Sequence, residues 1–241
     1  MTELLYLLNC YLKEFESKII SVREENNNLF VVLEKTAFYP RSGGQPEDKG
    51  FLIKENNKFF VKDVIKNDNE VIHVVEKNNG CDLKVGDLVM GEIDWQRRYY
   101  FMRCHTAAHV LSAIINKETG ALITGNNIDE EKVRIDFNLE NFDREKFVDY
   151  VKRANDFIRE GHSVELSILK REEAFKIPDL VKLQKMLPET IREVRIVKIN
   201  DLDIQACGGT HVKNTSEIGS IELLSVENKG KNNRRIYFKI K

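Results

Sequence analysis

The sequence lacks any apolar run long enough to cross a membrane as a helix. The apolar segment near its start, Leu4 to Leu12, is short and interrupted by polar residues. The chain also lacks a basic leader with an apolar stretch and a small-residue cleavage site, which mark secreted proteins. These absences predict a cytoplasmic protein that does not contact membranes.

Cysteine is scarce, with four in 241 residues. The cysteines lie far apart or beside a histidine, at Cys10, Cys81, Cys104 and Cys207. In a reducing cytosol, cysteines in such positions are more often free thiols or metal ligands than disulfides. We therefore predict no disulfide framework.

Neither sign of charge is in excess, because 38 Lys and Arg stand against 39 Asp and Glu and leave a net charge of −1. Such a protein has no long-range field that would draw it as a whole to nucleic acid. Any contact with RNA must therefore use local basic patches.

The first part of the chain is rich in short strand-forming segments separated by Asn, Gly and Asp. The predicted strands cover residues 15–22, 29–33, 51–53, 59–65, 71–75 and 88–93. This spacing is typical of a small barrel or sandwich. We assign residues 1–95 to a small antiparallel β-barrel domain that carries a glycine-rich loop.

The pattern changes at Trp95, after which helices and strands are mixed. Helical periodicity predicts helices over 96–116 and 143–160, the second capped by Asn141 or Asp143 and ended by Gly161. Further strands are predicted at residues 133–137, 164–169, 194–199, 218–223 and 236–240. The fold class is therefore α+β, with a second domain over residues 96–241.

Two pairs of metal-ligand residues lie in this second part. His105 and His109 are four residues apart in a predicted helix, so both imidazoles project from one face. Cys207 and His211 have the same separation, but Gly208-Gly209 between them favours a tight loop. Three imidazoles and one thiolate form a ligand set that zinc accepts in tetrahedral geometry. We predict that one zinc ion is bound by these four residues.

Other nearby residues are assigned to structure. A zincin protease needs Glu directly after its first histidine, and here that position is Thr106, which argues against that chemistry. Cys104 would point about 100° away from His105 around a helix, so we interpret it as a packed thiol. We also interpret His73, in an apolar strand, and His162, at a helix end, as structural residues.

Three segments are open to either a binding or a structural interpretation. The loop Thr36 to Gly50 contains Arg41, which can meet a phosphate, and Gly43-Gly44, which allow a ligand to approach the backbone. Composition alone favours an ordinary Gly/Pro loop of a barrel. The segment Lys229 to Arg235 is basic, with Lys231, Arg234 and Arg235 as candidate RNA contacts, although most such runs are simply solvated. Arg97 to Arg103 mixes basic and aromatic residues, which suits RNA or a core anchor.

Three motifs together resemble a known family: residues 38–46 (FYPRSGGQP), 103–109 (RCHTAAH) and 207–212 (CGGTHV). They are similar to the editing domain of alanyl-tRNA synthetase, and more closely to its free-standing relatives, the AlaX alanyl-tRNA editing proteins. The similarity covers nearly the whole chain. The chain has the N-terminal glycine-rich domain that short members lack, and it lacks the C-terminal domain of the longest, so it resembles the medium-length type.

The resemblance implies a hydrolase that acts in trans on alanine tRNA mischarged with serine or glycine, by cleaving the ester at the 3′ adenosine. It implies that His105, His109, Cys207 and His211 are the zinc ligands. It also implies that the Gly43, Gly44 and Gln45 loop is associated with the tRNA end, and that Thr36 recognises the serine hydroxyl.

Several points stay open at this level. Zinc could activate water or only organise the pocket, because four protein ligands would close the site. No motif fixes a protein general base. Alternative interpretations are a zinc-stabilised module that binds tRNA without catalysis, and an editing hydrolase for another aminoacyl-tRNA, because the threonine synthetase has a related editing domain. The oligomeric state is not predicted.

Overall fold

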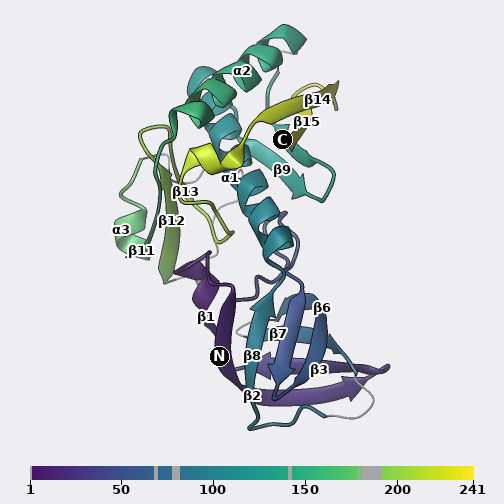
Figure 1. Ribbon diagram of the computed structural model, residues 1–241. Helices are drawn as coiled ribbons and strands as arrows, with labels where there is room; N and C mark the ends of the chain where they lie inside the picture. Colours follow the sequence, from purple (N-terminus) through teal and green to yellow (C-terminus); the bar gives the residue numbers. More distant parts are fainter. Residues whose placement is uncertain (1, 68–69, 78–81, 141–142, 179, 181–191) are drawn as a thin grey trace. The chain divides into compact units, whose positions relative to one another are not determined.

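The structure, a computed structural model, describes residues 2–67, 70–77, 82–140, 143–178, 180 and 192–241 (Figure 1). The chain divides into two compact units, Met1–Tyr100 and Phe101–Lys241, and each is described by itself. The helix α1 (Trp95–Thr119) begins in the first unit and continues in the second. Among the described residues no helix is both long and apolar enough to cross a membrane.

The first unit is a closed antiparallel barrel with the strand order β2-β3-β7-β6-β5-β8. Its strands are β2 (Glu14–Glu25), β3 (Asn28–Leu33), β5 (Gly50–Lys54), β6 (Asn57–Asn67), β7 (Glu70–Glu76) and β8 (Leu88–Ile93). All six predicted strands are present, and the predicted antiparallel barrel is confirmed.

The interior of the barrel is filled by every second side chain of its strands. In β2, Phe15, Ser17 and Ile19 are buried while the residues between them are exposed, as expected when successive side chains point to opposite faces. The ring of Phe15 lies against Gly91 of β8, where a Cβ atom would collide with it. A short parallel pair, β1 (Glu3–Leu4) with β4 (Lys35–Thr36), and the 3₁₀ turn η1 (Leu5–Leu7) were not predicted.

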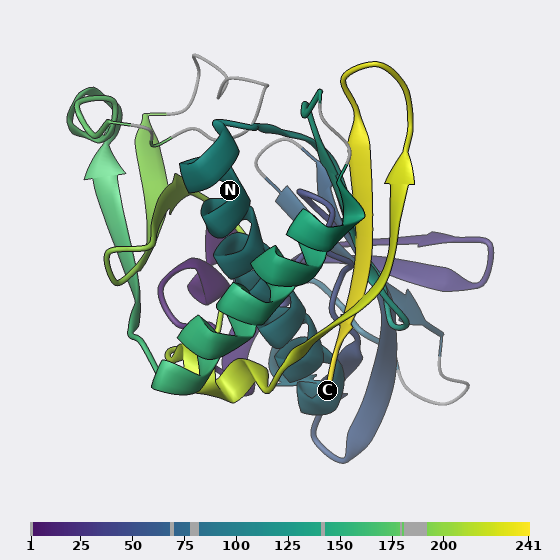
Figure 2. The same cartoon turned by 90° about the horizontal axis from the view of Figure 1, so that it is seen from above.

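The second unit contains two antiparallel sheets, with α1 between them (Figures 1 and 2). The larger sheet has the order β14-β15-β10-β9, and the smaller has the order β11-β12-β13. The elements are β9 (Ile123–Ile128), β10 (Val133–Phe137), α2 (Arg144–Glu160), β11 (Val164–Lys170), α3 (Arg171–Ala174), β12 (Glu193–Ile199), β13 (Asp203–Ala206), η2 (Thr215–Ile218), β14 (Ile221–Asn228) and β15 (Arg234–Ile240). The predicted α+β class is confirmed.

Local signals explain the ends of α2. The Asp143 side chain accepts hydrogen bonds from the backbone N–H groups of Glu145 and Lys146, and Gly161 ends the helix in the left-handed conformation. Asp143 is therefore the cap. The alternative cap, Asn141, lies outside the described residues, as does Cys81.

One predicted strand boundary is wrong. The strand expected over residues 218–223 begins only at Ile221, because residues 215–218 form the 3₁₀ turn η2. Asn214 and Glu217 cap this turn reciprocally, and Gly219 leaves it with φ +85°. The capping box (Asn214 with Glu217) therefore competes locally with the strand pattern.

Candidate metal centre

The four predicted ligands converge in the second unit. The ligand atoms of His105, His109, Cys207 and His211 all lie within 4.8 Å of one another. The Sγ atom of Cys207 is 3.6 Å from Nε2 of His105 and 3.4 Å from Nε2 of His211. In a tetrahedral zinc site, with bonds of about 2.3 Å to sulfur and about 2.0–2.1 Å to nitrogen, sulfur and nitrogen are about 3.5 Å apart. These two sulfur–nitrogen distances match that spacing, and the four ligand atoms together lie close enough to hold one ion.

Helix α1 and a glycine loop bring the ligands together. His105 and His109 lie one helical turn apart on α1, with their ring centroids 5.2 Å apart. Cys207 follows β13 directly, and Arg195 of β12 donates to the carbonyl oxygens of Cys207 (2.7 Å) and Gly209 (2.8 Å). The buried guanidinium of Arg195 thus holds the loop in which Cys207 and His211 converge.

The three histidines are buried, whereas Cys207 is partly accessible. Nδ1 of His109 lies 2.9 Å from a carboxylate oxygen of the buried Asp203, which must accept the hydrogen bond. This leaves Nε2 of His109 for a metal ion. Asp203 was not predicted from the sequence. Metal-bound histidines commonly donate to carboxylates, which makes an acidic residue near the motif expected, but Asp201 lies in the same segment and the sequence does not choose between them.

The cluster is electrostatically arranged for a cation. Burial would raise the pKa of the Cys207 thiol, but the charges of His105, His211 and His109 hold it well below its usual value. Burial would lower the pKa of His109, but the Cys207 thiolate and Asp203 together raise it to about 10. The pKa of His211 is well below its usual value, because of burial and then the charge of His105. A metal ion bound at Nε2 of His109 would therefore replace the proton that this ring holds without a metal, and one thiolate with three imidazoles is then a donor set that zinc accepts.

The other cysteines that the structure describes, Cys10 and Cys104, are buried, and neither is part of a disulfide. Cys104 is not among the residues of the metal cluster, which agrees with its interpretation as a packed thiol. His162 stacks on Phe157 and contacts Glu160 and Asn200, so its structural interpretation is also supported.

The glycine loop lies in the first unit and contains a tight hairpin turn. Ser42 and Gln45 exchange two backbone hydrogen bonds, and Gly43 and Gly44 between them have φ values of +57° and +85°. Two positive φ angles in a two-residue turn require glycine or a residue that tolerates them, such as Asn. The glycines are therefore explained by the turn, and their association with the tRNA end stays a prediction. Gln45 is buried.

Arg41 extends from this loop to two carboxylates. Its guanidinium donates to both oxygens of Asp63 at 3.0 Å and lies 3.1 Å from Glu47. The side chain is nevertheless 64% exposed, so a phosphate could reach it only in competition with these partners.

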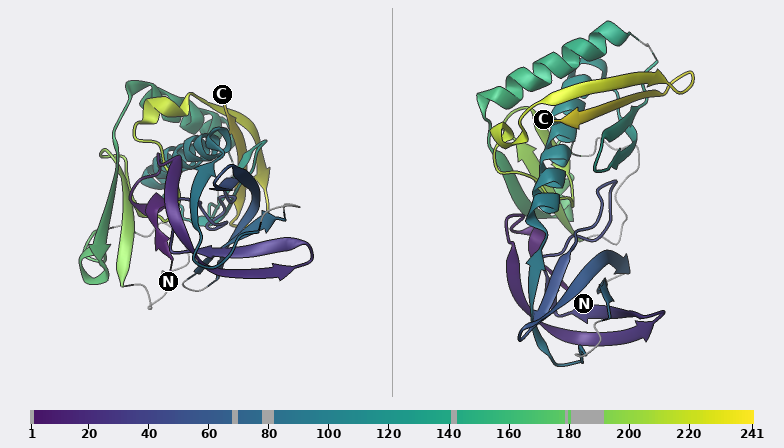
Figure 3. Two further views of the ribbon diagram at one scale, coloured as in Figure 1. Left: turned by 60° about the horizontal axis from the view of Figure 1, so that its bottom comes forward. Right: turned by 45° about the vertical axis from the view of Figure 1, so that its right-hand side comes forward.

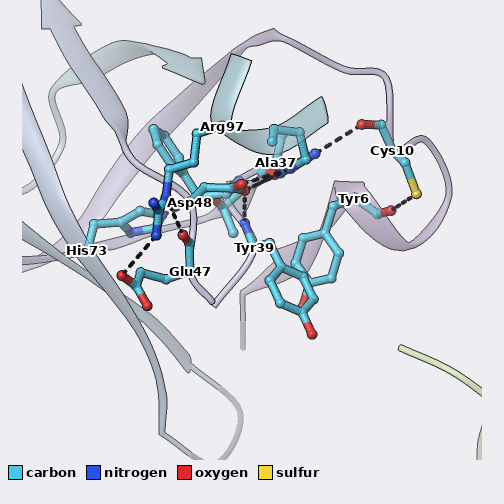
Figure 4. A network of polar contacts seen from close by, with 11 residues as sticks. Tyr6, Cys10, Ala37, Tyr39, Glu47, Asp48, His73 and Arg97 are labelled. Atoms are coloured by element: carbon cyan, nitrogen blue, oxygen red, sulfur yellow. Dashed lines mark hydrogen bonds and ion pairs between the residues drawn. The ribbon is translucent and has the colours of Figure 1, made fainter. Parts of the chain in front are cut away.

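A buried ion pair fixes the rest of the loop. Arg98, in the first turn of α1, pairs with Asp48 and also donates to the carbonyl oxygens of Cys10 and Ala37. Asp48 in turn accepts the backbone N–H of Tyr39 at 2.6 Å (Figure 4). Arg98 is therefore part of the core, which supports the anchor interpretation of this basic and aromatic segment.

Thr36 and His73 form a hydrogen-bonded pair inside the barrel. Nδ1 of His73 is 3.1 Å from the carbonyl of Val31 and must donate to it, so Nε2 accepts from the Thr36 hydroxyl at 2.8 Å. The Thr36 oxygen also accepts the N–H of Phe38 at 3.1 Å. Thr36 is completely buried, and its hydroxyl can accept only one further hydrogen bond. Its predicted contact with serine stays a prediction.

Figure 3 shows the β14–β15 hairpin in yellow. Its three candidate RNA residues differ in burial and in their hydrogen-bond partners. Lys231 is exposed in the loop at the tip. Arg235 forms a two-pronged pair with Asp136, at 2.6 and 2.9 Å. Arg234 is buried and donates to several backbone carbonyls, including those of Gly230 and Glu140. Arg234 thus closes its own hairpin, and its buried side chain does not support the predicted contact with RNA.

Comparisons with known proteins agree with the motifs. Residues 194–237 match the family described as the threonyl and alanyl tRNA synthetase second additional domain, and residues 9–97 match class II (A) tRNA synthetases. The alanyl-tRNA editing protein AlaX-M of Methanosarcina barkeri is 49% identical over 99% of this chain and 98% of its own length.

Two further relatives allow the chain to be compared with the medium-length and the long members of the family. AlaX-M of Saccharolobus solfataricus is 46% identical over the whole of both chains. AlaX-L of Pyrococcus horikoshii is 37% identical over 99% of this chain, but only 58% of its own length is covered. The chain therefore belongs to the alanyl-tRNA editing proteins of the AlaX family and is similar over its full length to the AlaX-M type.

Proposed function

We propose that this protein hydrolyses the ester that joins serine, or glycine, to the 3′ adenosine of alanine tRNA, and that it acts in trans. The observation that carries the proposal is the convergence of three histidines and one cysteine in a chain of this family. Because its substrate belongs to translation, we propose the cytoplasm as its location.

We propose zinc as the metal, because three imidazole nitrogens and one thiolate at this spacing suit zinc better than a hard cation such as magnesium. When bound, zinc supplies a Lewis acid that can polarise a carbonyl or lower the pKa of a water molecule. Four protein ligands form a closed site, which favours an organising role over direct attack. Asp203 orients the ring of His109, and we assign no protein general base.

Discrimination is expected to come from the hydroxyl of serine. A site that hydrogen-bonds this hydroxyl can reject alanine by roughly 10⁴-fold or more, because its own buried polar groups would be left unpaired. Thr36 has one acceptor position left for this purpose, but it is buried, so a substrate reaches it only if the surrounding protein opens. Thr36→Val tests this: RNA affinity should be unchanged while selectivity for serine is lost.

Contacts with the RNA are proposed at Lys231 and Arg235. Lys231 is exposed, and Arg235 presents a guanidinium already oriented by Asp136. These are local charges, as the net charge of −1 requires.

The test is to charge alanine tRNA separately with serine, glycine and alanine, and to measure release of each amino acid. We expect the wild type to release serine, and glycine to a lesser extent, and to spare alanine. His105→Ala should lower the rate of deacylation by more than about 100-fold. Loss of a metal ligand should have a larger effect than the 10–100-fold decrease that is typical when an outer-shell residue is lost. His162→Ala, a histidine outside the cluster, is the matched control and should keep the rate.

Equal release of all three amino acids, or a full rate for His105→Ala, would overturn the proposal. Binding of the charged tRNA without any release would favour a non-catalytic tRNA-binding module. Threonine tRNA charged with serine serves as a further substrate, and its preferential hydrolysis would favour an editing enzyme for threonine tRNA.

A further inference from the structure

Thr106 occupies the position directly after the first metal-ligand histidine. It is completely buried in α1, and about 100° of helix rotation separates it from His105, so it is not itself a ligand. Its hydroxyl nevertheless reaches the other half of the metal cluster. Oγ1 of Thr106 lies 3.1 Å from Nδ1 of His211 and 3.2 Å from the backbone nitrogen of Val212.

The direction of each hydrogen bond can be assigned by counting hydrogens. A hydroxyl has one hydrogen to donate and two lone pairs that accept. The Thr106 hydrogen points to the carbonyl oxygen of Met102 at 2.8 Å, because a carbonyl can only accept. The backbone N–H of Val212 can only donate and therefore uses one lone pair. The other lone pair must accept from Nδ1 of His211, so this nitrogen carries the hydrogen.

This assignment fixes the tautomer of His211. With the hydrogen on Nδ1, Nε2 keeps its lone pair, and Nε2 is the atom that lies 3.4 Å from the Cys207 sulfur. His109 has its own partner, because Asp203 accepts from its Nδ1. The two histidines thus face the same point through Nε2, one fixed by a carboxylate and the other by a hydroxyl.

We propose that Thr106 is a positioning residue of the metal centre: its hydroxyl holds His211 in the tautomer that binds metal and ties the α1 half of the site to the Cys207–His211 loop. The position at which a zincin would carry a catalytic glutamate therefore serves here to orient a ligand. The inference rests on the metal centre of the proposed function, but its test measures metal and tautomer and does not involve tRNA.

The first experiment compares three variants by competition with a zinc-binding dye. Thr106→Val keeps the shape but removes the hydroxyl, and we expect zinc affinity to fall 10–100-fold, as for other outer-shell residues. Thr106→Ser keeps the hydroxyl and should stay within a few-fold of the wild type. Ser112→Ala is the matched control, because Ser112 is a buried hydroxyl of the same helix whose oxygen has no partner among the described residues. It should leave zinc affinity unchanged.

Wild-type affinity in Thr106→Val, or an equal loss in Thr106→Ser or Ser112→Ala, would overturn the proposal. The second experiment needs no variant and decides the matter if Thr106→Val fails to fold. Nitrogen-15 NMR of zinc-loaded wild-type protein should show the His211 hydrogen on Nδ1, with Nε2 bound to the metal. A metal-bound Nδ1 would contradict the inference, whatever the deacylation assays show.

Discussion

The two units of the molecule bury their polar groups in opposite ways. In Met1–Tyr100, Arg98 and Asp48 are both buried and neutralise each other, and their hydrogen bonds go to each other and to nearby backbone. In Phe101–Lys241, three imidazoles and a thiolate bring their ligand atoms together at one point. A buried network whose charges and hydrogen bonds are paired with one another has a structural role. Electron-pair donors that converge on one point instead form a binding site for a cation.

The strongest test of this comparison is to break the buried ion pair. Asp48→Asn leaves Arg98 as an uncompensated buried charge, so the free energy of unfolding should fall by about 3–5 kcal/mol. Urea unfolding monitored through Trp95, the single tryptophan, measures this. Zinc affinity should not change. The control Asp63→Asn removes a carboxylate partner of the exposed Arg41 and should cost less than about 1 kcal/mol. Equal losses in both variants would contradict a structural role for the buried pair.

The burial of His73, the partner of Thr36, can be tested by measuring the stability of the protein as a function of pH. Burial lowers the pKa of His73 from 6.5 to about 4, so the folded protein holds this histidine neutral while the unfolded chain binds a proton. Stability should therefore be complete above pH 6.5 and decrease as the pH falls toward 4, by about 3 kcal/mol in total at 1.36 kcal/mol per pKa unit. The variant His73→Gln should lack this part of the pH dependence. An unchanged pH profile of unfolding would show that His73 is not buried in its neutral form.

Asp203, the carboxylate beside the metal cluster, should affect the affinity for zinc and not the stability of the barrel. Asp203→Ala removes the acceptor of the His109 hydrogen bond, and zinc affinity should fall 10–100-fold. Asp203→Asn keeps an acceptor and should show a smaller loss. Asp136→Asn is the matched control, because Asp136 is a buried carboxylate of the same unit that pairs with Arg235. If dye competition gives Asp136→Asn the same loss, Asp203 has no specific role.

The smallest effect is expected at the glycine turn. Gly43 has φ +57° and open space around the position of a Cβ atom, so a substitution meets conformational strain but no collision. Gly43→Val should cost about 1–2 kcal/mol of unfolding free energy, whereas Gly43→Asn, which tolerates this conformation, should stay within about 0.5 kcal/mol. If both variants lose the same stability, the turn does not explain the glycine. Loss of deacylation by Gly43→Asn at normal stability would assign the loop to the substrate.

Sequence predicted the barrel and the four residues of the His/Cys cluster for simple physical reasons. Three histidines and one cysteine in two closely spaced pairs have few common uses in proteins other than metal binding. The alternation of buried and exposed residues in strands such as β2 follows directly from the pleat of a β-strand. The inward orientation of the Arg234 side chain could also have been predicted from the sequence. Ile236, Phe238 and Ile240 point inward along β15, so the same alternation places Arg234 inward and Arg235 outward.

Partners that lie far apart in the chain were not predictable in this way. Asp48 and Arg98 are separated by 50 residues, and Thr106 and His211 by 105, so only the folded chain shows that they meet. Asp203 lies closer to its motif, but nothing in the sequence selects it over other acidic residues nearby. Thr36 shows the same limit, because its burial and its bond to His73 are properties of the barrel.

The central claim, that His105, His109, Cys207 and His211 hold one zinc ion, is tested most directly by metal analysis with X-ray absorption at the zinc edge of the purified protein. We predict one zinc per chain, surrounded by one sulfur and three nitrogen atoms, with sulfur at about 2.3 Å and nitrogen at about 2.0–2.1 Å. A zinc content well below one per chain, or a coordination shell without sulfur, would contradict the account.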